Sequence, residues 1–224
     1  PVVVVPGTVV TTPTPGVIST PGAEGTLAVT SYSSGLASTV YENDSKVAIL
    51  GFQAEAKNSD IAIQRVKLNL GNSTKFYNKI FKKLYITDTN GTVLASIDLN
   101  SDTVIKDGST YYITITGMNT VVSKGTKKNF LVKADVYSSI DSTDYDTETY
   151  PIQLANDGVR GVDGVRIDQY SPATGSSVSR TPTISADLVD SATLTVSTNS
   201  ASPKSSDIVA KGGSALNEFD KASV

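Results

Sequence analysis

Four acidic residues lie close together in one short polar stretch, at Asp141, Asp144, Asp146 and Glu148. Calcium prefers six to eight oxygen ligands, and flexible loops commonly supply them. The stretch lacks the glycine hinge and distal glutamate of an EF-hand loop, so a solvated acidic loop is the alternative interpretation. No cofactor is certain from the sequence, and calcium is the one candidate, with these four residues as tentative ligands. A weaker candidate set comprises Asn156, Asp157, Asp163 and Asp168.

The chain contains no histidine and no cysteine. Their absence excludes imidazole general bases, Ser-His triads, thiol nucleophiles and tetrahedral zinc sites. Paired carboxylates could hydrolyse glycosides, but the chain has no tryptophan and few aromatic residues to hold a sugar ring. We therefore predict that the protein is not an enzyme.

A basic run consists of Lys75, Lys79, Lys82 and Lys83, interleaved with aromatic residues. Such a run could contact an anionic cell-wall polymer, although solvated lysines beside a strand are the more common arrangement. The net charge is −3, which argues against nucleic acid as a partner because phosphate neutralisation needs an excess of basic residues. The sequence also lacks the long apolar run of a membrane span.

Alternating apolar residues predict strands through most of the chain, from Thr26 to Ile167. The pair Asn90-Gly91 between two such runs predicts a hairpin, because both residues tolerate a positive φ. A phase slip is expected near Gln64-Arg65, a bulge at Gly51, and a late strand through Val165 and Ile167. One short helical turn is expected at 74–79. The predicted fold class is all-β, an Ig-like antiparallel β-sandwich.

The first 24 residues contain five of the nine prolines, mixed with threonine, valine and glycine. Proline fixes φ and removes a backbone donor, so we interpret 1–24 as an extended Pro/Thr-rich linker. The threonines are also typical of an O-glycosylated stalk, and a bare spacer is the alternative.

An internal repeat relates the two ends of the remaining chain. Phe219 lies 167 positions after Phe52, and at the same offset Leu194 matches Leu27 and Val196 matches Val29. This distance is too long for a solenoid repeat and indicates tandem domains. We predict a complete domain over 25–185, with Phe52 in its core, and the start of a second repeat over 190–224.

Several segments resemble tandem Ig-like modules of bacterial surface proteins, including GTLAVTSYSSGLASTV, VAILGFQAEAKNSDIAIQRVKLNL and KLYITDTNGTVLASI. The resemblance is to surface-layer-like cell-surface proteins of the Patescibacteria type. It covers nearly the whole chain, including the Thr-Pro linker, but it consists of strand patterns and transfers no functional residues.

The resemblance implies an extracellular, cell-surface location and a structural role in a surface layer, sheath or filament. The expected mechanism is assembly rather than catalysis, with self-association or neighbouring subunits as partners. The alternative is an adhesin or a carbohydrate- or cell-wall-binding module, with a cell-wall glycan as the partner. Neither alternative involves nucleic acid or a membrane span.

Overall fold

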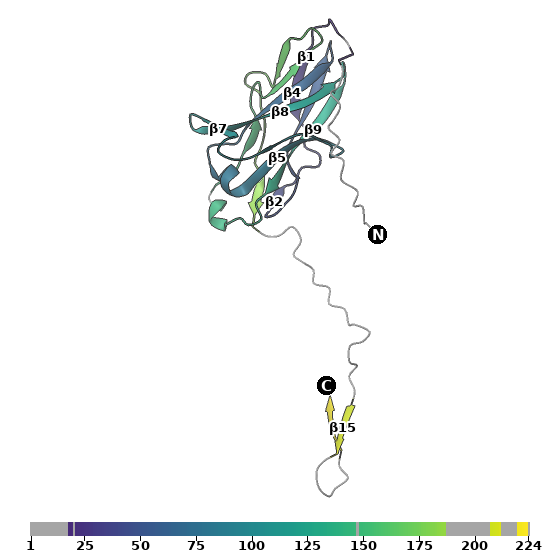
Figure 1. Cartoon of the computed structure of the whole chain (residues 1–224), viewed down its shortest axis with the longest axis vertical. Coiled ribbons are helices and arrows are strands. Elements are labelled where there is room, and N and C mark those ends of the chain that lie inside the picture. The colour runs from purple at the N-terminus through teal and green to yellow at the C-terminus, as the bar shows by residue number, and fades with distance from the viewer. Residues whose placement is uncertain (1–17, 20, 147, 187–206, 212–218, 224) are drawn as a thin grey trace, which may run out of the picture. The chain divides into compact units, whose positions relative to one another are not determined.

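β-strands account for most of the secondary structure, as the alternation of apolar residues predicts. The computed structural model describes residues 18–19, 21–146, 148–186, 207–211 and 219–223. The chain divides into two units, Pro1–Val189 and Asp190–Val224 (Figure 1). The predicted all-β class is confirmed, and nearly all strand pairs are antiparallel.

In its described residues, the first unit contains fourteen strands and two single helical turns. The strands are β1 (Thr26–Ser31), β2 (Thr39–Tyr41), β3 (Val47–Lys57), β4 (Ile61–Asn69), β5 (Phe81–Asp88), β6 (Val93–Asp98), β7 (Val104–Asp107), β8 (Thr110–Val122), β9 (Lys127–Val136), β10 (Ile152–Leu154), β11 (Val159–Val162), β12 (Asp168–Ser171), β13 (Val178–Arg180) and β14 (Thr183–Ser185). The turns are η1 (Phe76–Ile80), which agrees with the predicted helical turn, and η2 (Ser142–Asp144).

Two antiparallel sheets form the body of this unit. The first has the strand order β1-β3-β9-β5-β6. In the second, the order is β12-β11-β4-β10-β13. Strand β8 pairs with the other edge of β4, and β7 pairs with β8. Strand β4 thus pairs with β8 on one side and with both β11 and β10, in succession, on the other. A small parallel pair, β2 with β14, completes the unit.

One hydrophobic core lies between the two sheets. Phe52 of β3 and Phe130 of β9 are fully buried and stack with their ring centroids 5.1 Å apart. Ile63 of β4 and Ile113 of β8 join the same cluster from the second sheet. Burial of each such side chain contributes about 1.5–3 kcal/mol, so this shared core is the main source of stability. The prediction that Phe52 belongs to the core is confirmed.

The predicted hairpin connects β5 and β6. Gly91 has φ +87°, and the Asp88 carboxylate accepts hydrogen bonds from the backbone N–H groups of Asn90 and Thr92. The predicted phase slip is also present, as a bulge in β4 between Ile63 and Arg65. Both features depend on local backbone chemistry, which explains why sequence alone predicted them.

The bulge predicted at Gly51 lies elsewhere in β3, between Ala48 and Leu50. Gly51 itself is required by close packing, because a Cβ atom there would lie 2.2 Å from the Tyr32 carbonyl oxygen. The Gly51 carbonyl accepts a hydrogen bond from the Tyr32 N–H at 3.0 Å. The glycine therefore permits the segment after β1 to lie directly against β3.

The strand predicted through Val165 and Ile167 is wrong. These residues lie in the turn between β11 and β12, and both are exposed. The Asp163 carboxylate accepts hydrogen bonds from both of their backbone N–H groups, which turns the chain. These hydrogen bonds from a side chain to the local backbone favour a turn over the strand that the apolar alternation predicts.

The second unit is described only as a hairpin of β15 (Asp207–Lys211) with β16 (Phe219–Ser223). The predicted strand at Leu194 and Val196 lies outside the described residues. In the described part of the chain, no helix is long and apolar enough to span a membrane.

Candidate functional site

The segment that precedes β1 is bound to the first unit by two buried carboxylates, those of Asp60 and Asp163. Asp60 accepts a hydrogen bond from the Ser19 backbone N–H at 2.6 Å, and Asp163 accepts one from the Gly25 N–H at 2.9 Å. Between these points, the Gly22 N–H donates to the Gly164 carbonyl at 2.8 Å. We call this the entry pole. The described residues of the predicted linker are therefore bound to the domain, and the rest of 1–24 lies outside the described residues.

Asp163 is held by several hydrogen bonds at the entry pole. Besides the Gly25 N–H, it accepts hydrogen bonds from Val165 N–H at 3.0 Å, Ile167 N–H at 2.9 Å and Gln169 Nε2 at 3.0 Å. Burial alone would raise the pKa of this carboxyl, but the backbone donors outweigh it and hold the pKa below its usual range. Its four donors give Asp163 a structural role in closing the turn onto β1.

The chain leaves the unit through β14, which pairs in parallel with β2. Ile184 of β14 is buried, and the backbone N–H of Glu42 donates to the Ser185 carbonyl at 3.1 Å. Just beyond β14, the Ala186 N–H donates to the Tyr145 hydroxyl at 3.2 Å. We call this the exit pole. Tyr145 belongs to the acidic loop, so the predicted calcium-binding loop lies at the exit.

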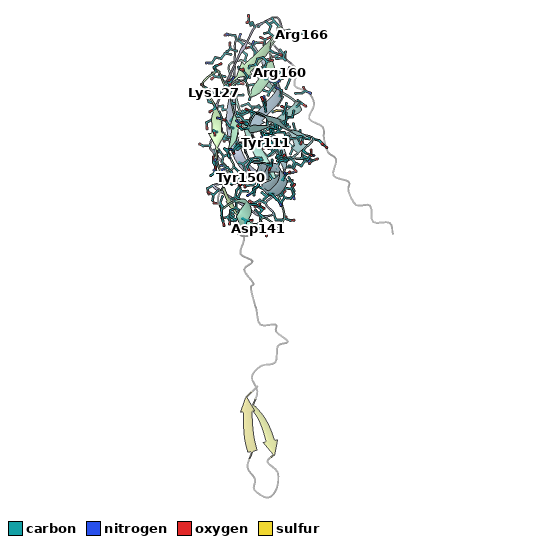
Figure 2. The ribbon with its side chains drawn as sticks, turned by 90° about the vertical axis from the view of Figure 1, so that its left-hand side faces the viewer. Tyr111, Lys127, Asp141, Tyr150, Arg160 and Arg166 are labelled. Atoms are coloured by element: carbon teal, nitrogen blue, oxygen red, sulfur yellow. The ribbon has the colours of Figure 1, made fainter. Side chains whose placement is uncertain are left out.

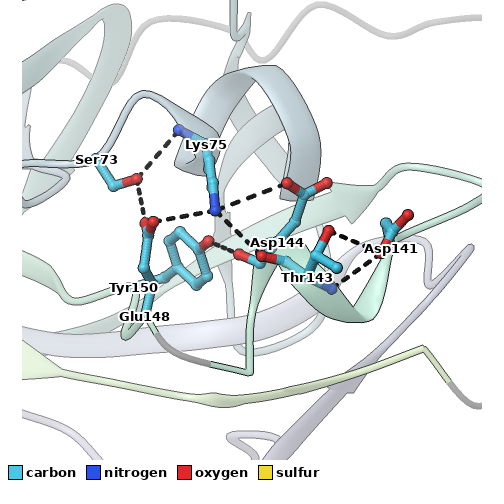
Figure 3. Close-up of polar contacts among 7 residues, drawn as sticks. All are labelled: Ser73, Lys75, Asp141, Thr143, Asp144, Glu148 and Tyr150. Carbon is cyan, nitrogen blue, oxygen red and sulfur yellow. Dashed lines mark hydrogen bonds and ion pairs between the residues drawn. The ribbon is translucent and has the colours of Figure 1, made fainter.

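Lys75 occupies the centre of the acidic loop (Figure 3). Its Nζ atom lies 3.0 Å from a Glu148 carboxylate oxygen and 3.8 Å from an Asp144 oxygen, and it donates to the Thr143 carbonyl at 3.2 Å. The Ser73 hydroxyl donates to the other Glu148 oxygen at 2.6 Å. The ammonium group of Lys75, the first member of the basic run, thus pairs with two of the four carboxylates that were predicted to bind calcium, those of Asp144 and Glu148.

Hydrogen bonding and charge alter the acidity of two groups in this network. The pKa of Glu148 is lowered, first by the Ser73 hydroxyl and then by Lys75. The pKa of Tyr150 is raised to about 12, first by burial and then by the charges of Glu148 and Asp144. The Tyr150 hydroxyl donates to the Asp144 carbonyl and so connects the loop to the buried core. Both groups keep their usual charge at neutral pH.

The remaining predicted ligands do not converge with Glu148 and Asp144. Asp141 begins η2 and accepts hydrogen bonds from the Thr143 N–H and hydroxyl, which lower its pKa. Asp146 is exposed, and its backbone N–H donates to the Ser142 carbonyl. Among the residues described, no group of three or more acidic side chains could hold a metal ion. Calcium thus stays a candidate at this loop, to be tested by EDTA and Ca²⁺ in thermal melts.

The two poles lie at opposite ends of the first unit. Figure 2 labels Arg166, in the turn at the entry pole, at one end, and Asp141 of the acidic loop at the other. Sequence reasoning identified the acidic loop but missed both poles, because their contacts join residues far apart in the chain. Asp163 and Gly25, for example, are 138 positions apart.

No protein-family model matches the chain, and a search of curated proteins finds no match. Among solved structures, one that matches is described as "AvmM Catalyzes Macrocyclization in Alchivemycin A Biosynthesis". It is 6% identical, the match covers 75% of this chain and 92% of that one, and the TM-score is 0.35.

This comparison contradicts the prediction that the chain is not an enzyme, because the matching structure is described by the reaction that its protein catalyses. That prediction is withdrawn. At this TM-score, the likeness assigns neither a reaction nor a catalytic residue to the chain.

Proposed function

We propose that this chain is an extracellular structural module of a surface layer, sheath or filament at the bacterial cell surface. In this proposal, the first unit is an Ig-like β-sandwich, and 190–224 begins a second repeat of the same kind. The module acts by assembly: tandem units set a fixed spacing, and strand edges or loops contact neighbouring subunits.

The placement of the two poles carries this proposal. A module in a tandem array receives the chain at one end and releases it at the other, so that units join in line. The first unit has this arrangement, with Ser19, Gly22 and Gly25 bound at the entry pole and β14 paired at the exit pole.

The backbone pairing at the exit also suits a module under tension. β14 and β2 pair in parallel, so their hydrogen bonds are evenly spaced along the two strands, and a pull along β14 loads several of them together. At the entry, Asp60 similarly accepts hydrogen bonds from the Ser19 N–H and hydroxyl, and Asp163 accepts one from the Gly25 N–H.

The proposal is tested by imaging and by localisation. We expect the concentrated full chain to form regular polymers in negative-stain electron microscopy, and antibodies against it to label intact cells of the source organism. Monodisperse particles at all concentrations, together with labelling only after cell lysis, would contradict the proposal.

A further inference from the structure

A groove on the outer face of the second sheet is the strongest unassigned feature. Arg65, Lys67 and Asn69 of β4 and Tyr112 of β8 form its floor, and the loop 155–158 between β10 and β11 forms one wall. The groove encloses about 300 Å³. That volume lies at the lower end of the range for small-molecule sites, and a short saccharide could occupy it.

The bulge in β4 creates the floor of this groove. After the register shift between Ile63 and Arg65, the inward positions are Val66 and Leu68, both fully buried. Arg65, Lys67 and Asn69 therefore alternate onto the outer face.

The wall depends on a close approach of backbone at Gly158. Its carbonyl accepts a hydrogen bond from the Lys67 N–H at 2.6 Å. A Cβ atom on Gly158 would lie 2.9 Å from the Ala155 carbonyl oxygen and 3.1 Å from that of Lys67. Glycine at this position thus lets the loop lie tightly beside β4 while Asn156 and Asp157 line the groove.

The two cations that line the groove, Arg65 and Lys67, outnumber its one carboxylate, that of Asp157. Within the described residues, neither Arg65 nor Lys67 forms an ion pair, and the buried Nε atom of Arg65 has no hydrogen-bond partner. Arg160 of β11 lies directly opposite Arg65, and its Nε is also buried and unpartnered, although its Nη1 lies 3.5 Å from Asp168. Like charges opposite each other destabilise a sheet, and an anion bound at Arg65 would reduce that cost.

Aromatic rings hold these cations in place. The Lys67 ammonium lies 4.5 Å from the centre of the Tyr112 ring, and the Arg65 guanidinium lies 5.8 Å from that of Tyr170. Such contacts fix a cation over a ring face without neutralising its charge. The amides of Asn69 and Asn156 add neutral hydrogen-bonding groups to the same groove.

We propose that this groove binds an acidic saccharide, a sugar unit that carries a carboxylate or a phosphate. The anionic group would lie against Arg65 and Lys67, which form charge-assisted hydrogen bonds with either anion. The sugar hydroxyls would hydrogen-bond to the two asparagines, with Asp157 accepting from a hydroxyl at the rim. This binding does not depend on the in-line arrangement that carries the proposed function.

The test uses the full chain with three probes. Trigalacturonate supplies carboxylates, glucose 1-phosphate supplies a phosphate, and galactotriose is the neutral control. By titration calorimetry or NMR, we expect at least one acidic probe to bind, to bind more tightly than galactotriose, and to weaken as salt is raised. Binding of neither acidic probe, or equal binding of galactotriose, would overturn the proposal.

Matched lysine variants locate the site. Lys67→Gln should weaken binding of the acidic probe about tenfold. Lys106→Gln is the control, because Lys106 also lies over a tyrosine ring, that of Tyr111, but it lies outside the groove. Both variants should keep the wild-type melting temperature. Equal affinity in the two variants would overturn the assignment of the groove, whereas polymer formation by Lys67→Gln tests the proposed function separately.

Discussion

The stacked rings of Phe52 and Phe130 lie at the centre of the first sheet's inner face, and neither is exposed. Phe52→Ala should lower the free energy of unfolding by about 3–5 kcal/mol, because it removes a buried ring and leaves a cavity. Urea denaturation measures the change. Ile105→Ala is the control, since Ile105 is 65% exposed and should change stability by less than about 0.5 kcal/mol. Similar losses in both variants would contradict the central role of Phe52.

Asp163 stabilises the entry pole as a charged acceptor. Asp163→Asn should cost about 1.5–3 kcal/mol at pH 7, because an amide cannot accept from all four donors. The folded pKa lies below the unfolded value of about 3.9, so the unfolded state binds the proton first as pH falls. This contribution is therefore present above about pH 4 and is lost on further acidification.

The measurement for Asp163 is the melting temperature between pH 3 and 7. Wild type should lose stability on acidification more steeply than Asp163→Asn. The exposed Asp102, changed to Asn, should behave as wild type. Parallel acid profiles for wild type and Asp163→Asn would show that the Asp163 charge does not stabilise the fold.

The sequence predicts the role of a single residue where that role depends on neighbouring residues or on the apolar period of a strand. Phe52 follows from alternation along its strand, which places it on the core side. Asp163 was grouped with metal candidates, because its Gly25 donor approaches only after the chain has folded. The sequence likewise places Lys75 in a basic run, since it does not show that the acidic loop packs against η1.

At the scale of elements, the acidic loop already contains a cation, the Lys75 ammonium. We therefore expect the melting temperature to stay constant between EDTA and millimolar Ca²⁺. Calcium at one hundred times its dissociation constant would stabilise the fold by about 2.7 kcal/mol. For a domain of this size, that is a shift of roughly 5–11 °C. A shift of that size would restore Asp141, Asp144, Asp146 and Glu148 as calcium ligands.

The basic run gives a matched pair of lysine variants. Lys75→Gln should lower stability by about 0.2–1 kcal/mol, the range for partly exposed ion pairs. Lys79→Gln, four residues away and exposed, should leave it unchanged.

The elements that the sequence predicts are those determined by residues close together in the chain. The hairpin at Asn90-Gly91 and the bulge after Ile63 follow from turn chemistry and from the apolar period. The order of strands in the sheets does not, because β4 pairs with β8, β10 and β11, which lie far along the chain. The groove was missed for the same reason: its cations come from β4 and its wall from the loop 155–158.

At the scale of the whole molecule, the absence of histidine and cysteine leaves no side chain of ordinary pKa that titrates near neutrality. Melting temperature should therefore be nearly flat from about pH 5.5 to 9. Burial and hydrogen bonding to Asp135 raise the pKa of Tyr85 to about 12, and that of Tyr150 is also about 12. Because both exceed the unfolded value of about 10, their contribution is complete below pH 10 and is lost as pH rises towards 12. A steep loss of stability between pH 6 and 8 would contradict this account.

The boundary between the two units lies at Val189 and Asp190. Every member of the described core lies between Leu27 and Ile184, so the first unit closes its own core. A fragment of residues 1–188 should therefore be a soluble, β-rich monomer that melts cooperatively, at the temperature of the corresponding transition in the full chain. Circular dichroism and analytical ultracentrifugation measure both properties. If 1–188 is unfolded while the full chain folds, residues 190–224 belong to the first domain, and the tandem arrangement in the proposed function is wrong.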